Sequence, residues 1–255
     1  MIEIKIGNEV DKEAWSEFVE LHPDSNPFQT PEMYEVYLQS AGMSPNVIAV
    51  LVNKKINGLL VTNTISEPLS SYIVENLSKR AVIIGGPLIT GRKTEIIGNL
   101  LLKEYERSIH DSALFTEIRN LKDCSVNNFF YDNGYSYNNH LNYLVDLTVG
   151  EEKLWANLSQ SKRRYIRKAL NQSKVETLVN KKDFLPFYRK LQSFYSQRVH
   201  KPLPDISHFE SLIDILQPKG MLKIFSVEKN SSIQGGIICI LYKDTIYEYY
   251  IFSER

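Results

Sequence analysis

The stretch Ile48–Val61, "IAVLVNKKINGLLV", decides the fold, because it predicts a β-hairpin that recurs later in the chain. Two β-rich runs flank a polar turn containing Asn and Gly, which is typical of a hairpin. A similar stretch, "IFSVEKNSSIQGGIIC", occupies Ile224–Cys239. Both hairpins follow two segments whose apolar residues have helical spacing. We therefore predict a structural repeat, in which two α/β units of similar topology follow one another.

The residues around the two hairpins predict the remaining elements of each unit. In the first unit we expect further strands at 2–6, 80–89, 113–121 and 142–149, and helices at 11–22, 31–41 and 93–110. In the second unit we expect helices at 151–173, 182–199 and 205–217, a strand at 174–179, and three strands within 221–252. The predicted domains are 1–149 and 150–255. The second unit stops where the first continues, so we expect it to be incomplete at its C-terminus, as in a fragment.

Composition limits the classes of function. The chain has 255 residues, 43% hydrophobic and 24% charged residues, and a net charge of zero, which is typical of a globular protein with a proper core. Zero net charge argues against broad DNA binding, which needs a basic surface. Cys124 and Cys239 lie too far apart in sequence for a disulfide framework or zinc cluster. A reduced, cytoplasmic location is expected, since signal-peptide and bilayer-length apolar segments are absent from the sequence; peripheral membrane contact stays open.

One short segment is strongly basic despite the neutral composition. "SKRRYIRKAL", Ser161–Leu170, carries five cationic and no acidic residues: Lys162, Arg163, Arg164, Arg167 and Lys168. On a helix, Arg163 and Arg167 share one side and Arg164 and Lys168 another, a spacing suited to a diphosphate. Ser159 or Ser161 can cap the helix and add backbone N–H groups. The alternative is a solvated helix face whose cations pair with acids elsewhere.

An ordered set of segments resembles the FemAB-type acyltransferases. These segments are "NPFQTPEMYEVY" (26–37), "IIGGPLI" (83–89), "LWANLSQSKRRYIRKALNQSKVE" (154–176), "FYSQRVHKPLPD" (194–205) and "GGIICILYKDTIYEYYIFSER" (235–255). The resemblance covers nearly the whole length and implies an α/β fold of two tandem GNAT-like domains, the second truncated. It also implies transfer of an aminoacyl group from charged tRNA to a peptidoglycan precursor, or acylation of a sugar in relatives linked to polysaccharide synthesis.

The chain departs from the family pattern in three places. A basic residue of the family is Tyr37 here, which puts one phosphate contact in doubt. We find no long helical-arm insertion in the second unit, so a tRNA contact of that kind would be lacking. The C-terminal part that carries a lysine implicated in the chemistry is absent from this sequence.

The resemblance implies where the site residues lie. Tyr247 and Tyr249 are the candidate catalytic residues, since family members place tyrosines on the corresponding strand; strand alternation predicts that they face one side and that Glu248 and Tyr250 face the other. The basic segment and Arg198 are the candidate acceptor-binding residues. Ordinary core tyrosines, and a helix-end cation at Arg198, are the alternative explanations.

The sequence thus predicts a metal-independent acyltransferase without a bound cofactor, which uses aminoacyl-tRNA or acyl-CoA as co-substrate. Its acceptor would be an amine on a phosphate-bearing cell-envelope precursor. "GGPLITGRKT" does not match a CoA-binding glycine-rich loop, so CoA binding is unsupported for the first unit. Two alternatives remain: an acyl-CoA-dependent N-acyltransferase acting on a nucleotide sugar, and a non-catalytic binding module.

Overall fold

The computed structural model describes residues 1–66, 79–109, 112–122 and 128–254. The chain forms two compact units. One is Met1–Asn138 with Pro204–Met221, and the other is Asn139–Leu203 with Leu222–Arg255. The segment 204–221 therefore packs with the first unit, although it lies in the second half of the sequence. The boundaries 1–149 and 150–255 stay a prediction. Cys124 and His110 lie outside the described residues.

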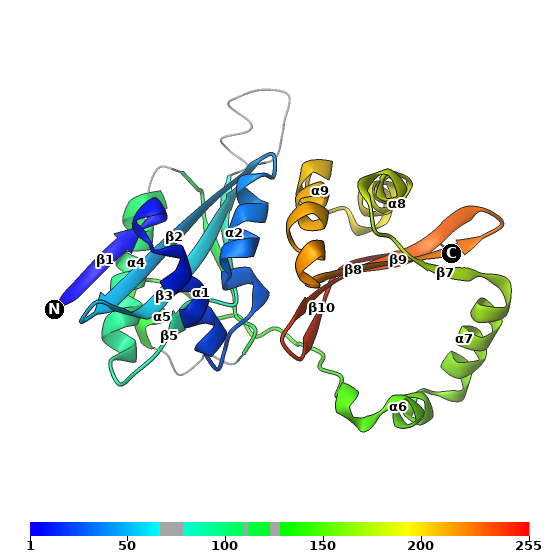
Figure 1. Cartoon of the computed structure of the whole chain (residues 1–255), viewed down its shortest axis with the longest axis horizontal. Helices are drawn as coiled ribbons and strands as arrows, with labels where there is room; N and C mark the ends of the chain where they lie inside the picture. Colours follow the sequence, from blue (N-terminus) through cyan, green and yellow to red (C-terminus); the bar gives the residue numbers. More distant parts are fainter. Residues whose placement is uncertain (67–78, 110–111, 123–127, 255) are drawn as a thin grey trace. The chain divides into compact units, whose positions relative to one another are not determined.

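The first unit is a mixed sheet with helices on both faces (Figure 1). The strands follow the order β1-β2-β3-β4-β6, and the short β5 pairs with β3 beside β4. All pairs are antiparallel except β4 with β6. The bounds are β1 Ile2–Ile6, β2 Met43–Val52, β3 Lys55–Ile65, β4 Arg80–Ile84, β5 Leu88–Ile89 and β6 Thr116–Arg119, with helices α1 Lys12–Leu21, α2 Pro31–Leu38, α4 Thr94–Ile109 and α5 Asn128–Asp132.

Alternation along the strands gives the sheet two apolar faces. Ile48, Val50 and Leu60 form one buried cluster with α4 and α5. Ala49 and Leu59, next to them in sequence, are also fully buried. Because neighbouring residues of a strand point to opposite faces, these two belong to the face on which α1 and α2 pack. The predicted caps are present: the Asp11 carboxylate accepts from Ala14 N at 2.8 Å, and the Thr30 hydroxyl accepts from Met33 N at 3.2 Å.

The two hairpins repeat each other down to single residues. The turn residues Asn53 and Lys54 both have positive φ, 51° and 68°, and so do Asn230 and Ser231, 52° and 59°. Positive φ at both positions defines a type I′ turn, which matches the strand twist. In each hairpin the register shifts by one residue shortly after the turn, at Asn57 and at Gln234. The predicted structural repeat is therefore confirmed in its central element.

The second unit is a four-stranded antiparallel sheet in the order β10-β9-β8-β7. Helix α8, Lys181–Phe194, packs on β9 and β10. A Cβ on Gly236 would lie 2.3 Å from the Phe187 ring, so α8 rests directly on the sheet there. The bounds are β7 Lys174–Thr177, β8 Leu222–Lys229, β9 Ser232–Tyr242 and β10 Thr245–Ser253.

Helix α9, Ile206–Ile215, packs against α2 as part of the first unit. His208 and Ser40, both buried, lie in contact, with Nδ1 and Oγ 3.0 Å apart. The Ser207 hydroxyl accepts from Ala41 N at 2.9 Å. The His208 ring also stacks on Tyr37, with ring centroids 6.2 Å apart. Tyr37 thus has a packing role in the structure.

Two expectations about the segment that precedes β7 are wrong. The expected strand at 142–149 is absent: Asp146 accepts from Thr148 N at 2.9 Å and starts a short 3₁₀ turn, Leu147–Val149. Such a side-chain-to-backbone bond competes with strand geometry. The single helix expected at 151–173 is two helices, α6 Glu151–Asn157 and α7 Gln160–Gln172, because Ser159 caps a new start at Lys162 N. Within the described ranges, no helix combines the length and apolar character required to cross a bilayer.

Candidate functional site

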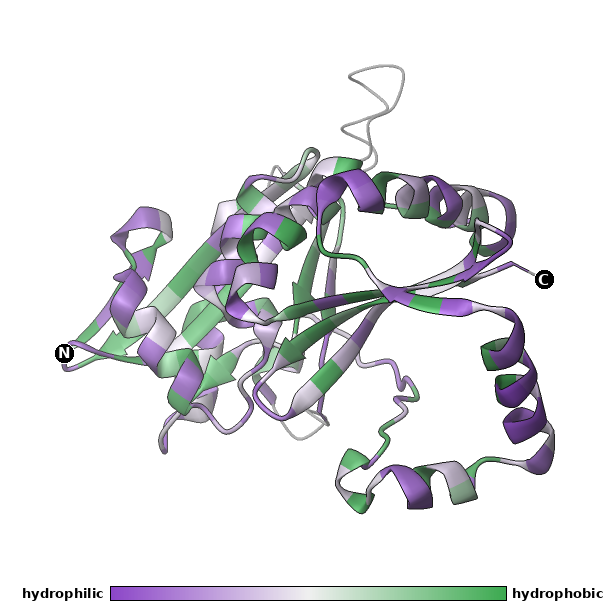
Figure 2. Cartoon of the chain, turned by 45° about the vertical axis from the view of Figure 1, so that its right-hand side comes forward, coloured by the Kyte–Doolittle hydropathy of each residue, from purple (hydrophilic) through white to green (hydrophobic). Residues whose placement is uncertain are grey.

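Four of the five cations on helix α7 are exposed, and the fifth, Arg163, is partly exposed. No residue of α6 or α7 is buried, and Figure 2 shows hydrophilic residues along most of α7. In the part of the chain that the structure describes, none of Lys162, Arg163, Arg164, Arg167 and Lys168 has an acidic partner within 4 Å. The alternative that these cations pair with acids elsewhere therefore finds no support in these residues.

The two predicted cation pairs differ in their surroundings. Arg163 Nη1 donates to the Ala156 carbonyl at 3.3 Å, and the Arg167 guanidinium lies 5.3 Å from the centre of the Trp155 ring. These contacts fix the corner between α6 and α7. Arg164 lies 5.5 Å from the ring of its neighbour Tyr165. Arg164 and Lys168 make no contact with α6 that would occupy their charged groups, so they form the more available pair for an anion.

The strand β10 places its tyrosines differently from the expectation. Glu248 pairs with Cys239 and Tyr250 with Ile238, so Tyr249 is the extra residue of a β-bulge. The bulge reverses the alternation, and Tyr250 joins Tyr247 on the face of Ile238 and Ile240. The prediction that Tyr247 and Tyr249 share a face is wrong for this reason.

An aromatic cluster joins β10 to the end of α8. The Tyr250 ring lies 4.6 Å from the Tyr249 ring and 5.7 Å from the Tyr195 ring, measured between centroids. Burial raises the pKa of the Tyr195 phenol. Burial, and then the charge of Asp244, raises the pKa of the Tyr247 phenol. Tyr195 and Tyr247 are therefore protonated at neutral pH, and each hydroxyl can donate a hydrogen bond.

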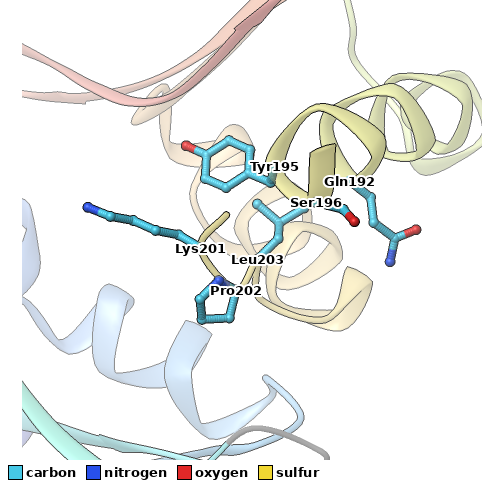
Figure 3. Close-up of a pocket in the computed structure, with 6 residues that line it drawn as sticks. All are labelled: Gln192, Tyr195, Ser196, Lys201, Pro202 and Leu203. Atoms are coloured by element: carbon cyan, nitrogen blue, oxygen red, sulfur yellow. The ribbon is translucent and has the colours of Figure 1, made fainter. Parts of the chain in front are cut away.

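A cavity of about 260 Å³ lies beside this cluster (Figure 3). Its lining residues are Gln192, Tyr195, Ser196, Lys201, Pro202 and Leu203. In Figure 3, the side chains of Tyr195 and Lys201 extend to one side, and that of Gln192 to the other. The backbone opens here because α8 passes into a π-helix, Tyr195–Val199, in which His200 N donates to Tyr195 O at 2.8 Å. Such π-helical turns are frequent at functional sites.

The predicted site residues are thus spread over two places in the second unit. Tyr249 lies in the aromatic cluster beside the cavity, whereas the five cations lie on α7. Arg198 lies in the last turn of the π-helix and is exposed; among the described residues, no interaction joins it to a side chain of α7. The catalytic and binding roles of all these residues stay predictions. Sequence periodicity could not reveal the cavity, because a single π-helical turn is too short to give a periodic signal of its own.

Groups of three or more His, Cys, Asp or Glu side chains suited to a metal ion do not occur among the residues that the structure describes. Metal independence stays an expectation from the sequence.

Comparison with known proteins supports the fold. No protein-family model matches the chain, and no curated protein matches it. A solved structure described as the crystal structure of FemX is similar with a TM-score of 0.64 and 14% identity, over 98% of this chain and 80% of that chain.

Two further structures match part of the chain. One is a putative acetyltransferase from Agrobacterium tumefaciens str. C58, with a TM-score of 0.41 and 13% identity over 56% of this chain and 99% of that one. The other is AAC(6')-Iy with a bisubstrate analogue, with a TM-score of 0.40 and 10% identity over 57% of this chain and 98% of that one. The similarity to FemX over nearly the full length confirms the resemblance stated above: the chain has a FemX-like α/β fold built from two tandem units.

Proposed function

We propose that the chain is an acyltransferase of FemAB type. It transfers an aminoacyl group from aminoacyl-tRNA to an amine of a phosphate-bearing cell-envelope precursor, such as a peptidoglycan intermediate. The FemX-like fold and the ordered segments that resemble the family support the class of reaction. The donor and the acceptor are proposed on the resemblance.

The observation that carries the acceptor class is the unpaired charge on α7. Like charges four residues apart on a helix repel by a few tenths of a kcal/mol per pair. In the described structure no carboxylate relieves this repulsion for Arg164 and Lys168. A diphosphate would relieve it, and its oxygens can accept charge-assisted hydrogen bonds from both side chains. The diphosphate and the amine belong to the same acceptor molecule. By binding the diphosphate, α7 would therefore position the amine for transfer.

The chemistry requires no covalent enzyme intermediate. The acceptor nitrogen attacks the carbonyl carbon of the donor ester, and a new C–N bond forms. The C–O bond to the tRNA then breaks, and the leaving oxygen takes the bonding electron pair and the proton that the amine loses. A tyrosine hydroxyl that stays protonated can donate a hydrogen bond to the carbonyl oxygen as negative charge develops there. We assign this role to Tyr247 or Tyr249.

A transfer assay with alternative donors tests the proposal. The purified protein is offered either charged tRNA or acetyl-CoA, together with a nucleotide-linked peptidoglycan precursor, and the acceptor is analysed by mass spectrometry. We expect an aminoacyl mass increase with charged tRNA and none with uncharged tRNA. Transfer from acetyl-CoA alone would replace the donor and favour an acyl-CoA-dependent N-acyltransferase. Binding of the precursor without transfer from either donor would overturn the enzymatic function in favour of a binding module.

A further inference from the structure

The cavity at the end of α8 carries hydrogen-bond donors that the protein does not use. Gln192, Tyr195, Ser196 and Lys201 line it, and within the described residues their side chains make no hydrogen bond or ion pair. Gln192, Ser196 and Lys201 are exposed and Tyr195 is partly buried, so a ligand in the cavity can reach these groups without displacing an internal contact. Tyr195 is the most fixed of them, because its ring packs against Phe194 and Tyr250 while its hydroxyl has no protein partner among the described residues.

The backbone around the cavity brings its lining residues together. The π-helical turn ends at His200, which has a left-handed conformation with φ 53° and ψ 36°. A non-glycine residue adopts this conformation at a cost of roughly 1–2 kcal/mol. The turn brings Lys201, Pro202 and Leu203 back beside Tyr195 and Ser196. The proline restricts the backbone on this side, which limits how far this wall of the cavity can rearrange.

The charge and size of the cavity limit what it can bind. Its lining includes one ammonium group and no carboxylate, so it favours an anion. Pro202, Leu203 and the Tyr195 ring give an apolar wall. A volume of about 260 Å³ lies just below the roughly 300 Å³ at which pockets for drug-sized ligands begin, which suits a single sugar-sized ring.

We propose that this cavity binds a small organic anion, of which the phosphate or carboxylate contacts Lys201 and the Tyr195 hydroxyl while a ring-sized body lies against Pro202 and Leu203. This site uses none of the α7 cations assigned to the acceptor diphosphate. It goes beyond the proposed function, because binding here requires neither a donor nor acyl transfer.

Three probes with nearly the same ring separate the contributions of charge and body: glucose 1-phosphate, glucuronate and glucose. We titrate each into the ¹⁵N-labelled full chain and follow the backbone amides of residues 192–203 by NMR. Saturable shifts are expected with an anionic probe and not with glucose. A response to glucose 1-phosphate alone identifies a phosphate site, and a response to glucuronate alone identifies a carboxylate site.

Substitutions at Lys201 test the contact itself. Lys201→Gln should raise the dissociation constant of the anionic probe about fivefold, as expected for loss of about 1 kcal/mol from a solvent-accessible ion pair. Lys201→Arg should retain most of the affinity. Lys182→Gln is the matched control. Lys182 is exposed near the start of α8, 13 residues before Tyr195, which is about 20 Å along the helix axis.

The proposal is overturned if glucose binds as well as the anions, if no probe shifts these amides, or if Lys201→Gln and Lys182→Gln bind alike. None of these results bears on the transfer assay, so the two proposals fail independently.

Discussion

At the scale of single residues, Gln29 shows that part of the segment 26–37 is structural. Its side chain is fully buried between two strands that diverge. Nε2 donates to Val61 O at 3.2 Å and to Ile84 O at 2.8 Å, and Oε1 accepts from Val61 N at 2.8 Å. The amide thus replaces the backbone pairing that β3 and β4 lack at this point. A Cβ on Gly86 would lie 2.8 Å from this amide, so the glycine leaves room for it.

Replacing this amide should destabilise the first unit. Gln29→Leu leaves the buried Val61 N–H and two carbonyls without partners, and we expect the free energy of unfolding to fall by about 3 kcal/mol. Urea denaturation, followed by the fluorescence of Trp15, measures this free energy. A Trp155→Phe background leaves Trp15 as the single tryptophan. Gln39→Leu, at an exposed position, is the control and should change stability by less than about 0.5 kcal/mol. A loss below about 1 kcal/mol for Gln29→Leu would contradict the bridging role.

His208 makes stability depend on pH. It is fully buried, and burial lowers its pKa to about 3 from the ordinary 6.5. Ser40 has one hydroxyl hydrogen and donates it to Val36 O at 2.6 Å, so the neutral His208 donates from Nδ1 to Ser40. Below pH 6.5 the His208 ring takes up a proton in the unfolded chain but not in the folded chain. The stability contributed by the buried neutral ring is therefore fully present above pH 6.5 and is lost as the pH falls below that value.

The pH dependence can be isolated by difference. Between pH 7 and pH 5.5 the wild type should lose about 1.3 kcal/mol more stability than His208→Gln. The exposed His140 provides the control, because His140→Gln should keep the wild-type dependence. Equal slopes for the wild type and His208→Gln would show that His208 does not titrate as a buried neutral group.

At the scale of elements, local patterns predicted what local chemistry determines. The hairpins, the caps at Asp11 and Thr30 and the basic helix all follow from residues close together in sequence. The expected strand at 142–149 failed because a strand also needs a partner, and Asp146 instead closes a turn on Thr148. The faces of β10 were missed because a bulge changes the alternation without changing the residue types.

The cavity belongs to the same class of feature. Tyr195 and Lys201 are visible in the sequence, but their proximity depends on the π-helical turn and on the left-handed His200. The role of Gln29 was also hidden, since its two partner residues, Val61 and Ile84, lie 32 and 55 residues away. Long-range hydrogen bonds of this kind leave no periodic signal.

At the scale of the whole molecule, the two halves of the sequence share one order of elements. β1-α1-α2-β2-β3-β4 in the first half corresponds to β7-α8-α9-β8-β9-β10 in the second half. The hairpins have the same turn and the same bulge position. The corresponding helices differ in use: α8 covers the sheet of the second unit, whereas α9 packs on α2. The sequence predicted the repeat, but not that α9 joins the first unit.

The central claim is that α7 binds the phosphates of the acceptor. The most direct measurement is the acceptor KM and kcat of Arg164→Gln/Lys168→Gln in the transfer assay, with Lys93→Gln/Lys103→Gln as a charge-matched control on the first unit. Removing two charge-assisted contacts should raise KM about tenfold or more and leave kcat nearly unchanged, because the lost interactions act on bound acceptor and transition state alike. With an acceptor that lacks phosphate, the α7 variant and the control variant should have the same KM. A KM within about twofold of wild type for the α7 variant would contradict the account.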